Sequence, residues 1–225
     1  MTISVLYYES PLMLKKQIEF WGNYPSGLKY IVIDDGSPTK PAKDVLRNTD
    51  LDIELYRIEE NIPWNIGGAR NLLFTVCEDD WILMMDIDHL MSLSGMDYIH
   101  SMPLDENCHY RFARFRPKED RWINPHRDTI LVRRDDYWKV GGFNEDISGY
   151  YGGKSIFFKQ LEKISNPVNL NNVYVIFVGD QVSEGANWGK KGSKFDLHNN
   201  PALLRKVKNV YKPGKTLRFN WRREK

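Results

Sequence analysis

Residues 81–88 read WILMMDID, and this stretch decides the fold class of the 225-residue chain. Five apolar residues in succession predict a buried β-strand, and two aspartates come directly after it. The sequence LKYIVIDDG at residues 28–36 repeats the arrangement, because an apolar strand over 28–33 again ends in a pair of aspartates. Two hydrophobic strands that each end at aspartates indicate a sheet with acidic side chains at its strand ends, where they can bind a ligand.

The first 90 residues alternate strand and helix around these two segments. Further strands are predicted at 2–8 and 52–57, and helices at 11–22, 40–47 and 68–78. This alternation is typical of parallel strands joined by crossover helices, so we predict a three-layer α/β domain. The second half is less regular. It is predicted to hold strands at 109–115, 129–133 and 172–178, helices at 135–140, 154–164 and 200–210, and a glycine-rich loop at 148–153.

Ligands of parallel sheets sit beyond the carboxyl ends of the strands, which is where both acidic clusters fall. Asp86 and Asp88 offer oxygen ligands that suit Mg²⁺ or Mn²⁺, although such a pair is equally compatible with a solvated turn. Asp34 and Asp35 can accept hydrogen bonds from a nucleobase or from ribose hydroxyls. Their context, Asp-Gly-Ser-Pro, is also good turn and helix-cap chemistry.

A third polar segment, residues 61–71, reads NIPWNIGGARN. Two adjacent glycines allow a backbone to approach a ligand closely, and Arg70 on the following helix can reach a phosphate. The glycines fit neither the dinucleotide fingerprint nor the Walker loop. The sequence therefore gives little support to a dehydrogenase or a P-loop kinase.

Composition and charge narrow the class of protein further. Hydrophobic residues make up 41% of the chain, which suits one globular domain. Two cysteines form no disulfide framework, so we expect reduced thiols and a cytoplasmic protein. No apolar run is long enough to span a membrane.

The charge is unevenly distributed along the chain. Residues 185–225 carry 12 Lys+Arg and 2 Asp+Glu, while the preceding residues carry 20 and 28. An acidic body with a basic end is not typical of a nucleic-acid-binding protein. The basic segment is expected to face a phosphate-bearing ligand, a membrane surface or a partner, or to be a solvated helix and tail.

The order and spacing of these motifs resemble the family 2 type of nucleotide-sugar glycosyltransferases with the GT-A fold. The resemblance rests on IVIDDGS at 31–37, NIGGARN at 65–71, WILMMDID at 81–88 and LVRRDDYWKVGGFNED at 131–146. It covers residues 2 to about 165, and small members occur in bacteria and in large DNA viruses, where such an enzyme would build capsid or surface glycans.

The resemblance implies a single catalytic domain over 1–225, with a mixed, mostly parallel sheet flanked by helices. It implies a nucleotide-binding half at 1–90, an acceptor-binding half at 91–200, and a basic helix and tail at 201–225. The activity implied is transfer of a hexosyl group from a nucleotide sugar, a UDP-sugar above all, to a hydroxyl of a glycan or glycoprotein. Peripheral membrane contact through the basic end is compatible with this function.

The resemblance also implies site residues. The residues expected to bind the donor are Tyr8, Glu9, Asp34, Asp35, Asn65, Arg70 and Asp86. Asp86 and Asp88 are expected to bind a metal ion, Mn²⁺ or Mg²⁺, which would offset charge on the leaving nucleoside diphosphate. The family often adds a histidine from the C-terminal third, for which His198 is the best placed, with His89 as the other candidate.

The chain departs from the family pattern at one informative point. The family carries Glu-Asp after its glycines, and that aspartate is the general base of inverting enzymes. Here Gly152-Gly153 is followed by Lys154-Ser155, neither of which is a carboxylate. Candidate bases elsewhere are Glu145, Asp146 and Asp128. Lys154 is free instead to bind a donor phosphate or an acidic sugar. A retaining mechanism would need no such base, and an inactive homologue would need none either.

Two other classes of function compete with the transferase. A nucleotidyltransferase also combines an α/β sheet with paired carboxylates, but residues 8–11, YESP, lack its glycine-rich basic signature. A non-catalytic nucleotide-sugar or glycan-binding module is favoured by the missing base. Aromatic side chains can stack on sugars or simply pack. We expect acceptor contacts from Trp122, Tyr150, Tyr151 and Trp188, and core packing from Trp64, Trp81 and Phe143.

Overall fold

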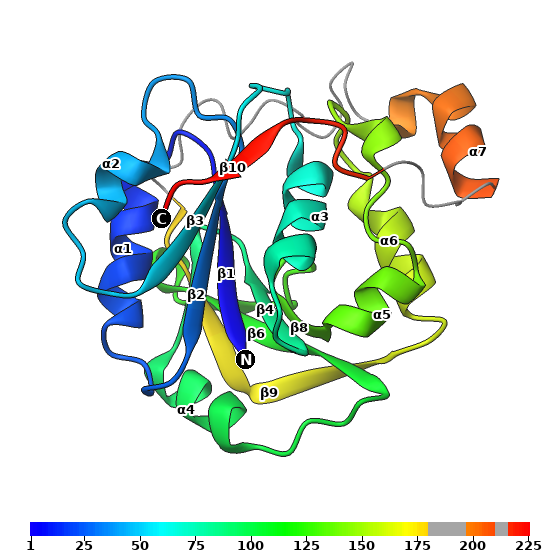
Figure 1. Ribbon diagram of the computed structural model, residues 1–225. Helices are drawn as coiled ribbons and strands as arrows, with labels where there is room; N and C mark the ends of the chain where they lie inside the picture. Colours follow the sequence, from blue (N-terminus) through cyan, green and yellow to red (C-terminus); the bar gives the residue numbers. More distant parts are fainter. Residues whose placement is uncertain (180–196, 210–215) are drawn as a thin grey trace.

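A ten-stranded mixed sheet runs through the protein, with helices on both of its faces (Figure 1). The computed structural model describes residues 1–179, 197–209 and 216–225. The strands are β1 Thr2–Tyr7, β2 Lys29–Asp34, β3 Ile53–Ile58, β4 Trp81–Met85, β5 His89–Met91, β6 Cys108–Arg116, β7 Arg121–Ile123, β8 Ile130–Arg133, β9 Asn166–Phe177 and β10 Trp221–Arg223. The α-helices are α1 Pro11–Trp21, α2 Ala42–Leu46, α3 Ile66–Val76, α4 Leu93–Ser101, α5 Arg134–Lys139, α6 Lys154–Leu161 and α7 Pro201–Asn209.

The first half of the chain builds the parallel part of the sheet that its sequence predicts. Strands β3, β2, β1 and β4 lie side by side and run parallel, connected by crossover helices. Their central residues are almost wholly buried, which explains why these strands read as continuous apolar runs. All their carboxyl ends therefore meet at one edge, and residues 7–10, 34–37 and 86–88 follow directly at that edge.

The second half adds antiparallel neighbours. Strand β8 pairs antiparallel with β4, so Ile130 lies opposite Met84. This register brings the residues just before β8 to the same edge as the residues just after β4. Strand β9 runs parallel to β6 and also pairs with the short strand β5, where His89 lies opposite Phe177.

Helices lie on both faces of the sheet (Figure 1). The apolar clusters beneath them differ in the residue types that they contain. On one face, α1, α2 and α4 contribute Leu14, Leu46 and Met96 to an apolar cluster. On the other, α3, α5 and α6 contribute an aromatic-rich cluster in which the rings of Phe74 and Tyr137 stack at 3.6 Å. Both faces are sealed, so the sheet edge at the strand ends is where a ligand gains access.

Strand β10 brings the end of the chain back to the first half of the sheet. It pairs antiparallel with β3, covering what would otherwise be an exposed edge strand (Figure 1). Arg222 pairs with Glu59 at 2.7 Å and Arg223 with Glu54 at 3.4 Å. This part of the basic tail is therefore occupied by the protein's own acidic groups. Among the described residues, no helix has the length and apolar character needed to cross a bilayer.

Some element boundaries differ from those that the sequence predicts. Helix α3 begins at Ile66, two residues early, and ends at Val76 because Cys77 takes an extended conformation. Helix α6 ends at Leu161, and β9 begins at Asn166, six residues before the predicted strand. The structure adds β5, β7 and β10, which have three residues each and so are too short for a periodic pattern. It also adds helix α4, which Ser92 caps by accepting from the Gly95 N–H at 3.2 Å.

Candidate active site

A cavity of about 760 Å³ opens at the carboxyl ends of the parallel strands. Segments that are far apart in sequence form its walls. They are the end of β1 and the residues after it, Asp35 after β2, the loop and first turns of α3, the residues after β4, the loops that precede β8 and α6, and the end of β9. The position is the one expected for ligands of an open α/β sheet. Its two ends differ in chemistry, and we call them the nucleoside end and the charged end.

Tyr8, Asp35 and Asn61 line the nucleoside end, and the buried Asn65 supports Asp35 without lining the cavity itself. The Asn65 amide donates to Asp35 Oδ1 at 3.1 Å, and the Tyr8 hydroxyl donates to Asn61 Oδ1 at 3.2 Å. Burial raises the pKa of Asp35 to about 7 and neighbouring Asp34 adds to the rise, because no cation among the described residues offsets the loss of hydration. This carboxyl can therefore donate as well as accept a hydrogen bond near neutral pH, which suits a ribose hydroxyl or a nucleobase.

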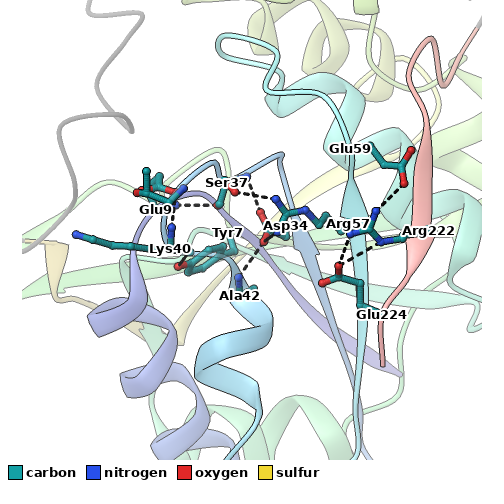
Figure 2. A network of polar contacts seen from close by, with 11 residues as sticks. Tyr7, Glu9, Asp34, Ser37, Lys40, Ala42, Arg57, Glu59, Arg222 and Glu224 are labelled. Atoms are coloured by element: carbon teal, nitrogen blue, oxygen red, sulfur yellow. Dashed lines mark hydrogen bonds and ion pairs between the residues drawn. The ribbon is translucent and has the colours of Figure 1, made fainter.

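Glu9 and Asp34 were expected to bind the donor, but the structure directs both into the protein framework (Figure 2). Asp34 is fully buried and accepts from the backbone N–H groups of Ser37 and Ala42 at 2.9 and 2.8 Å. Glu9 accepts from the N–H groups of Thr39 and Lys40, both at 2.9 Å. These carboxylates hold the loop after β2 in shape, and neither lines the cavity. Turn and cap chemistry decides their role here.

The charged end begins at the Asp-x-Asp segment after β4. Asp86 and Asp88 both line the cavity, with side chains about a quarter exposed. His126 Nδ1 lies 2.9 Å from Asp86 Oδ2, and His89 Nδ1 lies 2.6 Å from Asp88 Oδ1. Burial and the neighbouring Asp128 tend to raise the pKa of Asp86, but His126 outweighs them and holds that pKa below its ordinary value.

Asp128 is the centre of charge at this end. It accepts from Arg70 Nη2 at 2.7 Å and from Lys154 Nζ, and it is almost wholly buried. Burial alone would raise the pKa of Asp128, but Arg70 and Lys154 hold it far below the usual range. An aspartate so strongly ion-paired takes up protons poorly, so the structure does not favour Asp128 as a general base.

Comparison with known proteins identifies the family. The model of the family "Glycosyl transferase family 2" matches residues 5–139. The chain belongs to this family. The match includes both acidic strand ends and extends through α5, so it contains most of the cavity wall.

Solved structures agree with the fold of this family 2 chain. TarS residues 1–349 from S. aureus superimposes with a TM-score of 0.65 at 15% identity, over 77% of this chain and 59% of that one. The mannosyltransferase PcManGT from Pyrobaculum calidifontis gives 0.63 at 14% identity, over 79% and 56%. GalNAc-T7 gives 0.67 at 11% identity, over 92% and 47%. The family 2 chain thus spans only about half to three-fifths of these three proteins, and the GT-A fold is what it shares with them. A search of curated protein sequences gave no match.

The other base candidates lie away from the cavity of this family 2 chain. Glu145 accepts from the Asn71 amide at 2.7 Å and from the N–H groups of Leu217 and Arg218 at 2.9 and 3.1 Å. Asp146 is exposed and pairs with the Arg218 guanidinium. Both carboxylates fasten the C-terminal segment to the body of the protein. Their position in the sequence beside the glycine-rich loop does not bring them to the cavity.

The histidine and aromatic candidates divide between cavity and surface. His198 is exposed in a short 3₁₀ turn, Leu197–Asn199, and does not line the cavity, whereas His89 lies beneath Asp88. Tyr150 and Tyr151 line the cavity. Trp122 is 58% exposed and stacks near Phe115 outside it, and Trp188 lies outside the described residues.

Two of the three aromatic residues expected only to pack also line the cavity. Trp64, which has a positive φ of 49°, lies in the cavity wall with its ring 6.2 Å from that of Tyr151. Phe143 packs in the core and also faces the cavity, where the Arg70 guanidinium lies 4.8 Å above its ring. Trp81 packs against Tyr110, as expected.

His126 is the site residue that sequence reasoning missed. It lies in the loop between β7 and β8, four residues before Ile130. The antiparallel register of β8 with β4 carries it next to the Asp-x-Asp segment. The usable signal was the His-Arg-Asp sequence at 126–128 directly before an apolar strand, once that strand is paired with β4.

Proposed function

We propose that the protein is a metal-dependent glycosyltransferase. It would move a sugar from a nucleoside-diphosphate sugar, a UDP-sugar, to a hydroxyl of a glycan or glycoprotein. The observation that carries the proposal is the charge of the cavity. Its described lining contains Asp86, Asp88 and Asp128, together with Asp35, which is partly protonated near pH 7, against two permanent cations, Arg70 and Lys154. A diphosphate would be repelled from such a site unless a divalent cation accompanied it.

The comparisons support a nucleotide-sugar donor. TarS has been solved with UDP and with UDP-GlcNAc, PcManGT with GDP-Man and Mn²⁺, and GalNAc-T7 with UDP, GalNAc and Mn²⁺. By position in the cavity, we assign the nucleoside to Tyr8 and Asp35, with the buried Asn65 amide holding Asp35 in place, and the diphosphate to the charged end. Two free, buried cysteines are compatible with action in the reducing cytoplasm, where we place the enzyme.

The side chains of the charged end can stabilise the leaving group in two ways. A divalent ion held at the Asp-x-Asp segment, Mn²⁺ or Mg²⁺, would act as a Lewis acid toward the departing diphosphate. Lys154 keeps its ammonium group in the cavity with its side chain 30% exposed, so it can pair with a phosphate oxygen while Asp128 fixes its position. Trp64, Tyr150 and Tyr151 then offer aromatic faces at which an acceptor sugar can stack.

A binding module without turnover is the second candidate. It is favoured by Lys154, which stands where the family has an acidic residue and forms an ion pair with Asp128. The two candidates differ in one measurable property, since only an enzyme releases free sugar from the donor when the acceptor is replaced by water.

The test combines titration of UDP, with and without Mn²⁺, with hydrolysis of a panel of UDP-sugars. Metal-dependent UDP binding together with slow hydrolysis of one UDP-sugar is the expected result and would also name the donor. Asp86→Ala should abolish both, while exposed Asp97→Ala on α4 should change neither. Binding without hydrolysis of any sugar, with glycan acceptors supplied, would favour the module. Failure to bind UDP, GDP or dTDP would exclude both candidates.

A further inference from the structure

The C-terminal segment of the chain passes the start of α3 on its way to β3, where it forms β10 (Figure 1). We call residues 217–220 the C-terminal anchor. None of these four residues lines the cavity. They nevertheless contact three segments that carry its walls, which are the loop between β3 and α3, the first turn of α3, and the loop that precedes α6.

Phe219 packs against the first turn of α3. A β-carbon at Gly68 would lie 2.6 Å from Phe219 Cε1, so the ring occupies the space that this glycine leaves. A β-carbon at the neighbouring Gly67, which lines the cavity, would lie 3.2 Å from Phe143 Cβ. Both phenylalanines are buried. Because protein interiors are close-packed, this part of the cavity wall keeps its position only while both rings stay in place.

Glu145 joins the C-terminal anchor to the body of the protein. Its carboxylate accepts from the N–H groups of Leu217 and Arg218 at 2.9 and 3.1 Å, and from the Asn71 amide at 2.7 Å. The side chain of Asn71 also donates to the Phe143 carbonyl and accepts from the Phe143 N–H, both at 2.9 Å. One buried network therefore connects the anchor to α3 and to the phenylalanine beneath the cavity wall.

The backbone of Leu217 is held in an uncommon conformation. Its φ is 56°, in the left-handed region that residues with a β-carbon rarely adopt. Such residues persist where the surrounding structure fixes them, and they are concentrated at functional sites. Here the Glu145 carboxylate fixes the turn. The pairing of β10 with β3 involves only residues 221–223 and does not require it.

Asn220 fixes the beginning of the loop between β3 and α3. Its backbone N–H and its side-chain amide donate to the Glu60 carboxylate at 3.0 and 3.1 Å, and its carbonyl accepts from the Glu59 N–H at 2.9 Å. Residues 61–64 follow directly and line the cavity. Since Phe219 packs where this loop enters α3, two consecutive residues of the anchor hold the loop at both of its ends.

We propose that the C-terminal anchor is a positioning element of the donor site, with Phe219 and Glu145 as its positioning residues. Neither lines the cavity. They hold the loop between β3 and α3, and the first turn of α3, in the arrangement that binds the nucleoside diphosphate. The inference rests on the proposed function, because it gives the end of the chain a task in binding the same donor.

The competing role is protection of the sheet edge. Coverage of β3 by β10 accounts for residues 221–223 but not for the position of Phe219 beside the cavity wall. The two roles predict different results for two aromatic residues of this segment. Phe219 packs on α3, whereas Trp221 packs on Tyr56 of β3, with ring centroids 6.0 Å apart. Trp221 is therefore the matched control for Phe219.

The first experiment titrates UDP, with Mn²⁺ present, into the full chain and its variants. Phe219→Ala should bind UDP about tenfold more weakly, because apparent affinity falls with the population of the binding-competent conformation. Trp221→Ala should change the affinity by less than about twofold. Phe219→Leu, which keeps an apolar side chain, should recover most of the loss. Thermal unfolding identifies a temperature at which every variant is folded.

Amide hydrogen exchange supplies a local measurement. In Phe219→Ala, the amides of residues 59–70 should exchange at least about tenfold faster than in the wild type, while those of α4 keep their rates. Glu145→Gln retains one acceptor oxygen, so it should give a smaller change, about threefold, in both exchange and UDP affinity. Faster exchange throughout the chain would mean that Phe219 serves only global stability, and would overturn the proposal.

The outcomes separate this inference from the proposed function. If the wild type binds UDP and Phe219→Ala binds it equally well, the positioning role is wrong and the transferase stands. If Trp221→Ala loses as much affinity as Phe219→Ala, the effect belongs to the pairing of β10, and the inference is again wrong. If the wild type binds none of UDP, GDP and dTDP, the proposed function fails and the inference fails with it.

Discussion

Two aspartates in one cavity behave in opposite ways. Asp35 at the nucleoside end has an amide partner and no cation, and its pKa is raised to about 7. Asp128 at the charged end touches Arg70 and Lys154, and its pKa is held far below the usual range. Both are desolvated, so the difference comes from neighbouring charge. The nucleoside end works through separate hydrogen bonds, whereas the charged end is a network in which each charge depends on the others.

The largest expected effect lies within that network. Asp128→Asn removes the closer of the two carboxylates beside the Arg70 guanidinium, which is 3% exposed, and leaves only Asp86 at 3.9 Å. Breaking a buried ion pair from one side costs about 3–5 kcal/mol, so the free energy of unfolding in urea should fall by about that amount. The matched control is Asp44→Asn, which removes an exposed pair with Arg47 and should change stability by less than about 0.5 kcal/mol. Similar losses in the two variants would contradict the network description.

The second effect falls on turnover. Asp86→Ala should lower UDP-sugar hydrolysis by about 10²- to 10³-fold, the usual loss when one electrostatic stabiliser of a developing charge is removed. Asp86 is 25% exposed and lies 3.9 Å from Arg70, so its closest charged neighbour is His126 at 2.9 Å. The Asp86→Ala change therefore leaves the buried Arg70–Asp128 pair intact and should lower the free energy of unfolding less than Asp128→Asn does. A variant with normal turnover would show that the charged end does not serve the chemistry.

The third effect is a pH dependence that belongs to the nucleoside end. The pKa of Asp35 is about 7 in the folded protein and about 4 in an unfolded chain. The folded state therefore binds this proton more tightly, and its contribution to stability is complete below pH 4 and lost as pH rises through 7. Asp35→Asn should flatten the decline of the unfolding free energy between pH 4 and 7. An unchanged slope would mean that Asp35 does not titrate in this range.

The smallest effect is expected at Tyr8. Tyr8→Phe removes one exposed hydrogen bond, that to Asn61, and keeps the ring. A net hydrogen bond of about 1 kcal/mol corresponds to roughly a fivefold loss of UDP affinity, measured by titration. A loss above a hundredfold would show that the nucleoside end is as coupled as the charged end, and the contrast between them would disappear.

The parts of the fold predicted from sequence are those encoded locally. Strands β2 and β4 are almost wholly buried, so their apolar runs identify them directly, and β1 and β3 read as strands from their apolar and β-branched residues. The cavity could be placed for the same reason, since Asp86 and Asp88 follow the last of these runs. Arg70 could also be placed at the cavity, because a helix start with adjacent glycines marks a ligand-facing turn, whereas Asn65 is buried beside Asp35 and does not line it.

The remaining site residues depend on pairing across the chain, which local patterns do not record. His126 reaches Asp86 only through the antiparallel register of β8. Glu145 is a candidate base by its place in the sequence near the glycine-rich loop. In the structure its carboxylate accepts a hydrogen bond from the backbone N–H of Leu217, 72 residues away. Asp34 has the sequence context of a donor ligand, but the nearby N–H group of Ser37 satisfies it, as its turn-forming context allows. Glu9 accepts from the N–H groups of Thr39 and Lys40, 30 and 31 residues away, and only the tertiary structure shows these partners.

The register of β8 against β4 has a consequence for assembly. It makes the charged end of the cavity a junction between the two halves of the chain. Asp86 and His89 follow strand β4 of the first half, and His126 precedes strand β8 of the second. A ligand that binds this junction binds only the folded protein and so adds to its stability in proportion to the logarithm of its concentration. The rise of the melting temperature with Mn²⁺ concentration would then report the affinity of this junction for the ion, without any substrate present.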